Sequence, residues 1–251
     1  MHAACYPFAP ARAGRVELVA GVGVSSVNLG ARTIVIVDDV RFTRVTLAKM
    51  LAGLGGPTVH EAEDGEGALK LLGQLGNRVD CVISDLEMPR LDGLGLLQAI
   101  RAGTEAIPRG LPVVILTGHS EFERMGAALL LDVDAFITKP VSKGAIEACL
   151  ARLLGDGHAV DRPLAAPHVY RRIDLSGAAV AAETPETENG LAERCVALAE
   201  IGDGALLARD LMFGNGRLLL PAHTRLNART VRLLHEVASV ASLPDKVWIV
   251  A

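Results

Sequence analysis

The polar side chains that could carry out chemistry each follow a short apolar run. They are Asp38 and Asp39, Asp85, Thr117, and Lys139. If these apolar runs are parallel strands, their carboxyl ends meet at one edge of a sheet, where the functional groups of such folds gather. Three carboxylates, one hydroxyl and one ammonium would then converge at that edge.

Three carboxylates at close range repel one another, and a bound cation relieves the repulsion. Hard carboxylate oxygens with coordination positions left for water suit Mg²⁺. A carboxylate held beside the metal is placed to attack a phosphoryl group, which yields an aspartyl phosphate. The metal and Lys139 would neutralise the negative charge spread over the transferred group. These residue types therefore indicate a magnesium-dependent acceptor of phosphoryl groups.

The elements that must position these groups are predicted by the hydrophobic pattern between residues 33 and 154. Short β-branched or apolar runs alternate there with segments of helical periodicity, which is typical of an α/β parallel sheet with helices on both faces. The expected strands are 33–37, 58–62, 79–84, 111–117 and 135–138. The expected helices are 41–54, 67–75, 94–102, 121–131 and 142–154, the last with Ser142 as its N-cap.

The flanking segments differ in composition from this central region. Residues 1–31 lack periodicity, and we expect a flexible extension or a stretch that precedes the real start of the protein. Residues 156–190 combine several prolines with few apolar side chains, which favours a linker carrying a short helical piece. Residues 191–251 predict a small α+β module. Its expected elements are strands at 205–212, 217–220 and 246–250 and a helix from Asn227 to about Val240.

The amino-acid composition excludes several classes of function. At roughly 100–200 residues per domain, the 251 residues suggest one or two domains, and 50% hydrophobic residues exclude a wholly disordered chain. The net charge of −4 supplies no footprint for nucleic acid or an anionic membrane. No apolar run approaches the ~20 residues of a membrane span. The scattered cysteines predict reduced core thiols of a cytoplasmic protein rather than a zinc site or a disulfide framework; they are Cys5, Cys81, Cys149 and Cys195.

Three motifs lie at the first, third and fifth expected strands: 33–39 (TIVIVDD), 84–93 (SDLEMPRLDG) and 136–140 (FITKP). Together they resemble the receiver domain of two-component response regulators over about residues 32–155. The intervals between successive strand-end residues, 46, 32 and 22 from Asp39 through Asp85 and Thr117 to Lys139, agree with that family. The resemblance implies a flavodoxin-like, doubly wound sheet of five parallel strands in the order 2-1-3-4-5.

The resemblance also implies the roles of the acidic residues. Asp85 is the phosphoacceptor. Asp39 and Asp85 bind Mg²⁺ directly, Asp38 acts on the metal mainly through water, and the backbone carbonyl of Glu87 completes the protein ligands. The implied phosphoryl donor is a histidine kinase or a phosphotransfer protein.

Further roles follow from the same resemblance. Lys139 pairs with the phosphoryl oxygens, and its peptide bond to Pro140 is expected to be cis. Thr117 hydrogen-bonds the phosphoryl group and moves toward it. Phe136 is the switch aromatic whose rotamer follows Thr117, which alters the face made by the fourth helix, the fifth strand and the fifth helix. Signalling to a downstream protein is expected through that face.

Two side chains are expected to modulate the lifetime of the aspartyl phosphate. Glu87 follows the phosphoacceptor by two positions, and His119 follows Thr117 by two. Both would overhang the path of an attacking water. His119 titrates near neutral pH and has an alternative interpretation as a solvated loop residue.

The function of residues 191–251 is less determined. Seven basic and six acidic residues give a balance too weak to favour DNA binding, and no helix-turn-helix pair is apparent. Arg225, Arg229 and Arg232 would share a helix face if the helix begins early, either as a solvated basic face or as a phosphate or nucleotide patch. No HD metal motif, GGDEF or EAL signature, or glycine-rich nucleotide loop is present, so no separate output enzyme is expected.

A short hairpin-and-helix segment of bacterial signalling proteins that carry HD-type phosphodiesterase domains is similar to 204–210 (GALLARD) and 215–226 (NGRLLLPAHTRL). The similarity favours a protein-contact module. Two function classes stay open: a phosphorelay regulator whose output is a protein contact, and a transcription regulator with an atypical DNA-binding end. A homodimer also stays open.

Overall fold

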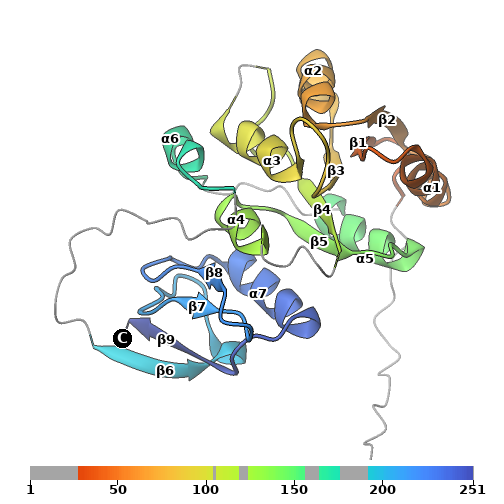
Figure 1. Cartoon of the computed structure of the whole chain (residues 1–251). Coiled ribbons are helices and arrows are strands. Elements are labelled where there is room, and N and C mark those ends of the chain that lie inside the picture. The colour runs from red at the N-terminus through yellow and green to blue at the C-terminus, as the bar shows by residue number, and fades with distance from the viewer. Residues whose placement is uncertain (1–27, 104–105, 119–123, 156–163, 176–191, 251) are drawn as a thin grey trace, which may run out of the picture.

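The computed structural model describes residues 28–103, 106–118, 124–155, 164–175 and 192–250. A five-stranded parallel sheet occupies the centre of the first half of the chain, in the order β2-β1-β3-β4-β5 (Figure 1). This confirms the predicted fold class and strand order. The strands are β1 Thr33–Val37, β2 Thr58–Ala62, β3 Cys81–Asp85, β4 Val113–Thr117 and β5 Ala135–Thr138.

Helices cover both faces of this sheet because side chains alternate between its faces along each strand. Ile34 and Ile36 join the core under α1 and α5, whereas Val35 and Val37 join the core under α2, α3 and α4. The helices are α1 Arg41–Ala52, α2 Gly65–Leu75, α3 Gly93–Ala102, α4 Met125–Leu130 and α5 Lys143–Leu154, with a 3₁₀ turn η1 at Gly76–Arg78.

Side-chain caps fix where several of these helices begin. Ser142 accepts a hydrogen bond from the amide of Ala145, which confirms it as the N-cap of α5. Asp64 and Asp92 cap α2 and α3 in the same way, so these helices begin slightly earlier than the apolar pattern predicted. Of the helix predicted at 121–131, the described part is α4, which ends shortly before Asp132, a residue with a positive φ of 55°.

The C-terminal module, residues 192–250, consists of two small antiparallel sheets and one helix. Strand β6 (Glu193–Ala197) pairs with β9 (Lys246–Val250), and β7 (Leu211–Met212) pairs with β8 (Leu218–Leu220). A 3₁₀ turn η3 (Leu198–Glu200) follows β6, and helix α7 spans Ala228–Val240. Asn227 caps α7 as predicted, because its side chain accepts from the amide of Thr230.

For this module, one predicted strand is wrong and another strand was missed. The strand expected at 205–212 is reduced to Leu211–Met212, because Leu206 and Leu207 form only isolated bridges to Arg225 and Ile249. Strand β6 was not predicted at all, since its three exposed leading residues give no alternating apolar signal. Cys195 lies on this strand and is exposed, contrary to the core position expected for it, whereas Cys81 and Cys149 are buried free thiols. Cys5 lies outside the described residues.

Part of the segment predicted as a linker packs against α3 and the loop before β5. Helix α6 (Pro167–Arg171) supplies the short helical piece that was expected there. The side chain of Gln98 in α3 donates to the backbone carbonyls of Tyr170 and Ile173 at 2.8 and 2.9 Å. The Tyr170 hydroxyl donates to the Asp132 carboxylate at 2.6 Å. Helix α6 is therefore held both to α3 and to the loop that precedes β5.

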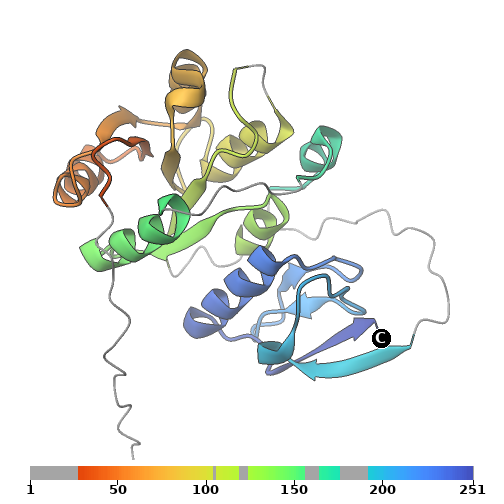
Figure 2. The same ribbon diagram turned by 180° about the vertical axis from the view of Figure 1, so that it is seen from behind.

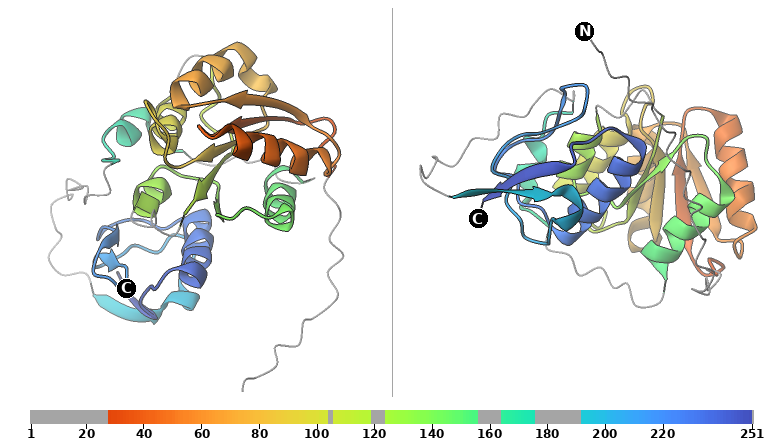
Figure 3. Two further views of the ribbon diagram at one scale, coloured as in Figure 1. Left: turned by 45° about the vertical axis from the view of Figure 1, so that its right-hand side comes forward. Right: turned by 90° about the horizontal axis from the view of Figure 1, so that it is seen from below.

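The C-terminal module lies against α4, β5 and α5, with α7 nearest to them (Figures 1 and 2). One continuous hydrophobic core includes α2, α3 and α4 and the interior of the module. Figure 3 shows the module beside the receiver region from two other sides, and β8 contacts α4. Within the described residues, no helix is both long and apolar enough to cross a membrane.

Candidate functional site

The carboxyl ends of β1 and β3 place three carboxylates together. Asp38 and Asp39 follow β1 directly, and Asp85 is the last residue of β3. One carboxylate oxygen from each lies within 4.8 Å of the others. Asp38 is fully buried and Asp85 is 5% exposed, whereas Asp39 faces solvent. The convergence of the three carboxylates expected from the strand ends is therefore present.

Asp38 has one satisfied and one unsatisfied carboxylate oxygen. Its Oδ1 accepts from the amide of Val40 at 2.8 Å, while Oδ2 is buried with no hydrogen-bond partner. Burial raises the pKa of this carboxyl above its ordinary value, and the charge of Asp85 raises it further, against the lowering effects of the Val40 amide and Lys139. An unpartnered buried oxygen beside two more carboxylates fits a hard divalent cation such as Mg²⁺.

Lys139 supplies the positive charge of the site. Its Nζ lies 2.6 Å from Oδ1 of Asp85, which also accepts from the amide of Leu86 at 2.7 Å. The amide of Lys139 donates to the carbonyl of Thr117 at 2.8 Å, so the pairing of β4 with β5 sets its position. The Lys139–Pro140 peptide bond is cis, as expected.

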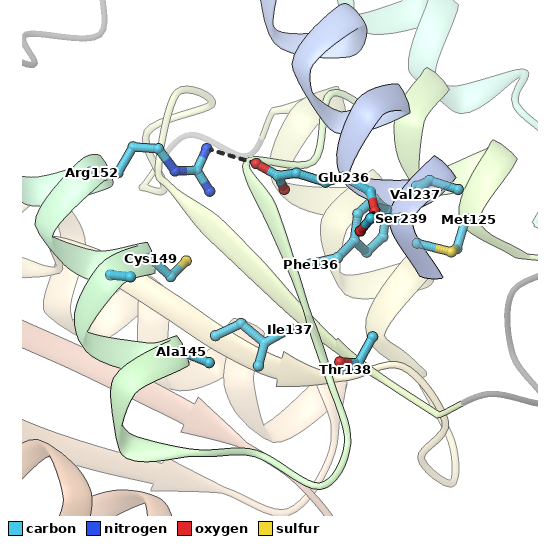
Figure 4. Close-up of a pocket in the computed structure, with 11 residues that line it drawn as sticks. Met125, Phe136, Ile137, Thr138, Ala145, Cys149, Arg152, Glu236, Val237 and Ser239 are labelled. Atoms are coloured by element: carbon cyan, nitrogen blue, oxygen red, sulfur yellow. Dashed lines mark hydrogen bonds and ion pairs between the residues drawn. The ribbon is translucent and has the colours of Figure 1, made fainter. Parts of the chain in front are cut away.

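Thr117 and Phe136 differ in how far they are buried. Thr117 is buried at the end of β4, and its hydroxyl donates to the carbonyl of Gly118 at 3.2 Å. Phe136 is half-buried in β5 and lines a pocket of about 450 Å³ between α4, β5, α5 and α7 (Figure 4). The Phe136 ring therefore faces a pocket between the receiver domain and helix α7 of the C-terminal module.

Of the two residues expected to modulate the lifetime of the aspartyl phosphate, the structure describes only Glu87. Glu87 is exposed, two positions after Asp85. His119 lies outside the described residues.

Arg44 of α1 belongs to the site, although the sequence interpretation missed it. Its Nη1 donates to the backbone carbonyl of Asp38 at 2.8 Å, and its Nε donates to the Glu61 carboxylate at 2.9 Å. The signal was available, because Arg44 precedes the buried Leu47 and Leu51 by three and seven positions and so shares their helix face.

The sequence profile of the response regulator receiver domain matches residues 34–151. These residues are a receiver domain of two-component signal transduction. Among curated proteins, the chain is similar to response regulator MprA from Mycobacterium sp. strain KMS and from strain JLS. Each is 36% identical over 120 residues, which is 48% of this chain and 48% of the relative. The match thus spans about half the length of these relatives.

Solved structures of receiver domains are similar to the same region. The signal receiver domain of a histidine kinase from Syntrophus aciditrophicus is 29% identical, with 54% of this chain and 99% of that chain covered and a TM-score of 0.46. The receiver domain of NtrX from Brucella abortus is also 29% identical, with 49% and 98% covered and a TM-score of 0.44.

Proposed function

We propose that the chain is a response regulator of a phosphorelay, and that Asp85 accepts the phosphoryl group of a histidine kinase or phosphotransfer protein. The supporting observation is the buried Asp85 carboxylate, which has Lys139 at 2.6 Å and two further carboxylates within 4.8 Å. A carboxylate oxygen of Asp85 forms the new bond to phosphorus while the phosphorus–nitrogen bond of the donor breaks. The electron pair of that bond stays on the donor imidazole.

The acidic residues would hold Mg²⁺ for this transfer. Asp39, Asp85 and the backbone carbonyl of Glu87 are the proposed direct ligands, and Asp38 the ligand acting mainly through water. When bound, the cation would neutralise negative charge on the phosphoryl oxygens. Arg44 holds the backbone at Asp38, so it keeps this loop in place without touching the phosphoryl group.

The basic and switch residues would act on the transferred group. Lys139, now paired with Asp85, would pair with a phosphoryl oxygen after transfer. Thr117 would turn its hydroxyl from the carbonyl of Gly118 toward the phosphoryl group, and Phe136 would follow by changing rotamer. In this proposal, phosphorylation is signalled to other proteins through the face formed by α4, β5 and α5.

We propose a protein contact as the output, in preference to DNA binding. Arg225 lies before α7 and donates to the carbonyl of Gly204, so the three arginines do not form one helix face. Arg229 is 17% exposed and contacts the Asp134 carboxylate, and Arg232 donates to the Asp134 carbonyl, so both arginines have partners within the chain. A gel shift on promoter DNA at several salt concentrations tests the alternative, and specific retardation would support it.

The proposed organisation is an extension at 1–31, a receiver domain at 32–155, a connecting segment at 156–190 and an output module at 191–251, without a separate output enzyme. Protease should cut the full chain first between residues 155 and 190. Early cutting between residues 33 and 154 would contradict these boundaries.

Labelling of Asp85 tests the proposed function. The full chain, given acetyl phosphate and Mg²⁺, should acquire acid-labile phosphate, and Asp85→Asn should abolish it. The substitution keeps the side-chain shape and relieves repulsion with Asp38 and Asp39, so the melting temperature without Mg²⁺ should hold or rise. Asp92→Asn is the matched control, because this carboxylate caps α3 outside the cluster and its loss should leave labelling intact. Retained labelling in Asp85→Asn would refute the assignment.

A further inference from the structure

Two arginines share one carboxylate oxygen where α5 lies near α7 (Figure 4). Nη1 of Arg152 in α5 lies 3.7 Å from Oε1 of Glu236, and Nε of Arg232 in α7 lies 3.6 Å from the same oxygen. A hydrogen bond from nitrogen to oxygen is shorter, at about 2.7–3.2 Å. Both nitrogens are buried, and within the part of the chain that the structure describes neither has a hydrogen-bond partner.

These two donors are unusual for a folded chain. Most buried polar atoms have a hydrogen-bond partner, and each exception calls for an explanation such as an ion or a ligand. Arg232 is held in place nonetheless, because its Nη2 donates to the carbonyl of Asp134 at 3.2 Å. Its Nε therefore stays directed to the same place as Nη1 of Arg152, and both are ready to donate to an added acceptor.

The charges at this place are also unbalanced. Glu236 supplies one negative charge against the two positive charges of Arg152 and Arg232. Asp134 does not remove the excess, because it already pairs with two other arginines. Burial lowers the pKa of Arg232, and repulsion from Arg152 lowers it further, against the raising effects of Glu236 and Asp134. The place therefore favours an acceptor that brings one negative charge.

A pocket of about 450 Å³ opens beside these groups (Figure 4). Arg152 and Glu236 line it, and most of its other walls are apolar, including Phe136, Ile137 and Val237. Pockets for small molecules have volumes of about 300–1,000 Å³ and combine apolar walls with a few polar groups that fix orientation. The pocket thus offers an apolar space next to two unsatisfied cationic donors.

We propose that this pocket binds a small molecule with one carboxylate and an apolar body. Because both nitrogens lie within 3.7 Å of one atom of Glu236, the two oxygens of a single carboxylate can span Arg152 and Arg232. Guanidinium N–H groups match carboxylate oxygens in geometry, and the bonds are charge-assisted. Together with Glu236, the bound carboxylate balances both guanidinium charges. The apolar body lies against Ile137 and Val237.

This inference goes beyond the proposed phosphorelay function and does not rest on it, since the acidic cluster takes no part. Calorimetric titration of the full chain with octanoate tests both halves of the ligand. 1-Octanol lacks the charge, and butanoate lacks four methylenes. Both should bind at least about tenfold more weakly than octanoate, because a hydrogen bond to a charged group contributes about tenfold and each buried methylene about fourfold. Equal affinity for octanoate and 1-octanol would overturn the inference.

Substitutions of the charged residues should change octanoate affinity in opposite directions. Arg152→Met keeps the apolar stem and removes the donors, so affinity should fall about tenfold or more, and Arg152→Lys should recover part of it. Glu236→Gln should raise affinity several-fold, because it removes the carboxylate that competes for the same donors. Arg225→Met is the matched control, because Arg225 is exposed and its partner Gly204 lies within the module.

A further variant fills the pocket without changing its charge. Ala148 lines the pocket from an exposed position of α5, so Ala148→Phe should weaken octanoate binding about tenfold or more. Ala52→Phe, at an exposed position of α1, is its control. Saturating octanoate should raise the melting temperature of the parent chain and of both controls.

The outcomes separate this inference from the proposed function. Asp85→Asn should bind octanoate as the parent chain does, so failure of Asp85 to label overturns only the proposed function. Absence of octanoate binding, or unchanged affinity in both Arg152→Met and Ala148→Phe, overturns only the proposed carboxylate site.

Discussion

Arg101 of α3 and Asp134 before β5 form an ion pair at 2.7 Å in which both side chains are withdrawn from solvent, at 0% and 1% exposure. The remaining donors of Arg101 are directed to backbone carbonyls of Asp132, Arg109 and Leu111. A fully buried guanidinium is tolerated only when its donors are satisfied in this way. The pair ties α3 to the loop that also carries the C-terminal module.

Removal of Arg101 should be among the most destabilising single changes in the chain. Arg101→Ala leaves Asp134 with Arg229 and one amide as partners and opens a cavity, so the free energy of unfolding should fall by about 3–5 kcal/mol. Urea denaturation of the full chain measures this fall. Arg209→Ala is the control, because its pair with Glu193 is exposed and should contribute less than about 1 kcal/mol. Equal losses in the two variants would contradict the argument.

The receiver fold and its acidic cluster were predictable because their signals are local. Each strand is a short apolar run, and the residue after it must lie at the carboxyl edge of a parallel sheet. That reasoning predicted Asp38, Asp39, Asp85 and Lys139 as neighbours without any information on packing. The caps at Asp64 and Asp92 refined the helix starts by only one or two residues.

The docking of the module could not be predicted, because its signals depend on partners far along the chain. Asp134 and Arg229 are separated in the chain by β5, α5, the connecting segment and strands β6 to β8. Strand β6 similarly acquires its partner, β9, only when residues 193–197 and 246–250 meet. Charged residues such as Arg229 and Arg232 read locally as a solvated face, and only tertiary structure shows that they contact Asp134.

Asp38→Asn should weaken Mg²⁺ binding by at least about tenfold, which corresponds to about 1.4 kcal/mol. The substitution preserves size but removes one charge from the cluster and replaces one carboxylate oxygen by an amide. Titration calorimetry on the full chain measures the affinity. Asp203→Asn removes the same charge from an exposed position in the C-terminal module and is the control. Equal affinity in the parent and Asp38→Asn would exclude Asp38 from the metal environment.

Tyr170 should lose its phenolic proton late in an alkaline titration. Burial raises the pKa of its phenol to about 12, and the hydrogen bond to Asp132 adds to the rise. Because the folded state disfavours the phenolate, the stabilising contribution is complete below the ordinary pKa near 10 and is lost as pH rises from there through about 12. The ultraviolet absorbance of tyrosinate should therefore contain a late component that Tyr170→Phe removes. The control Tyr6→Phe should retain it, and loss of the late component there would contradict the assignment.

The lifetime of the aspartyl phosphate should depend on Glu87 and His119. Hydrolysis requires a water that attacks phosphorus in line, opposite the oxygen of Asp85, and these two side chains follow the phosphoacceptor and the switch hydroxyl by two positions. Glu87 is exposed and can orient that water or repel the phosphoryl group. His119 can hold the phosphoryl oxygens when charged or guide water when neutral. Neither side chain excludes water as a large apolar group would.

Glu87→Ala and His119→Ala should each change the rate of phosphate loss several-fold, which corresponds to about 1 kcal/mol of barrier. Magnesium coordination by Asp39 and Asp85 should be unaffected, because neither side chain is a proposed ligand. Decay of labelled phosphate is timed beside the parent, with Glu66→Ala and His168→Ala as controls at exposed positions outside the cluster. If decay is unchanged in both test variants, the attacking water approaches along a path that neither side chain reaches.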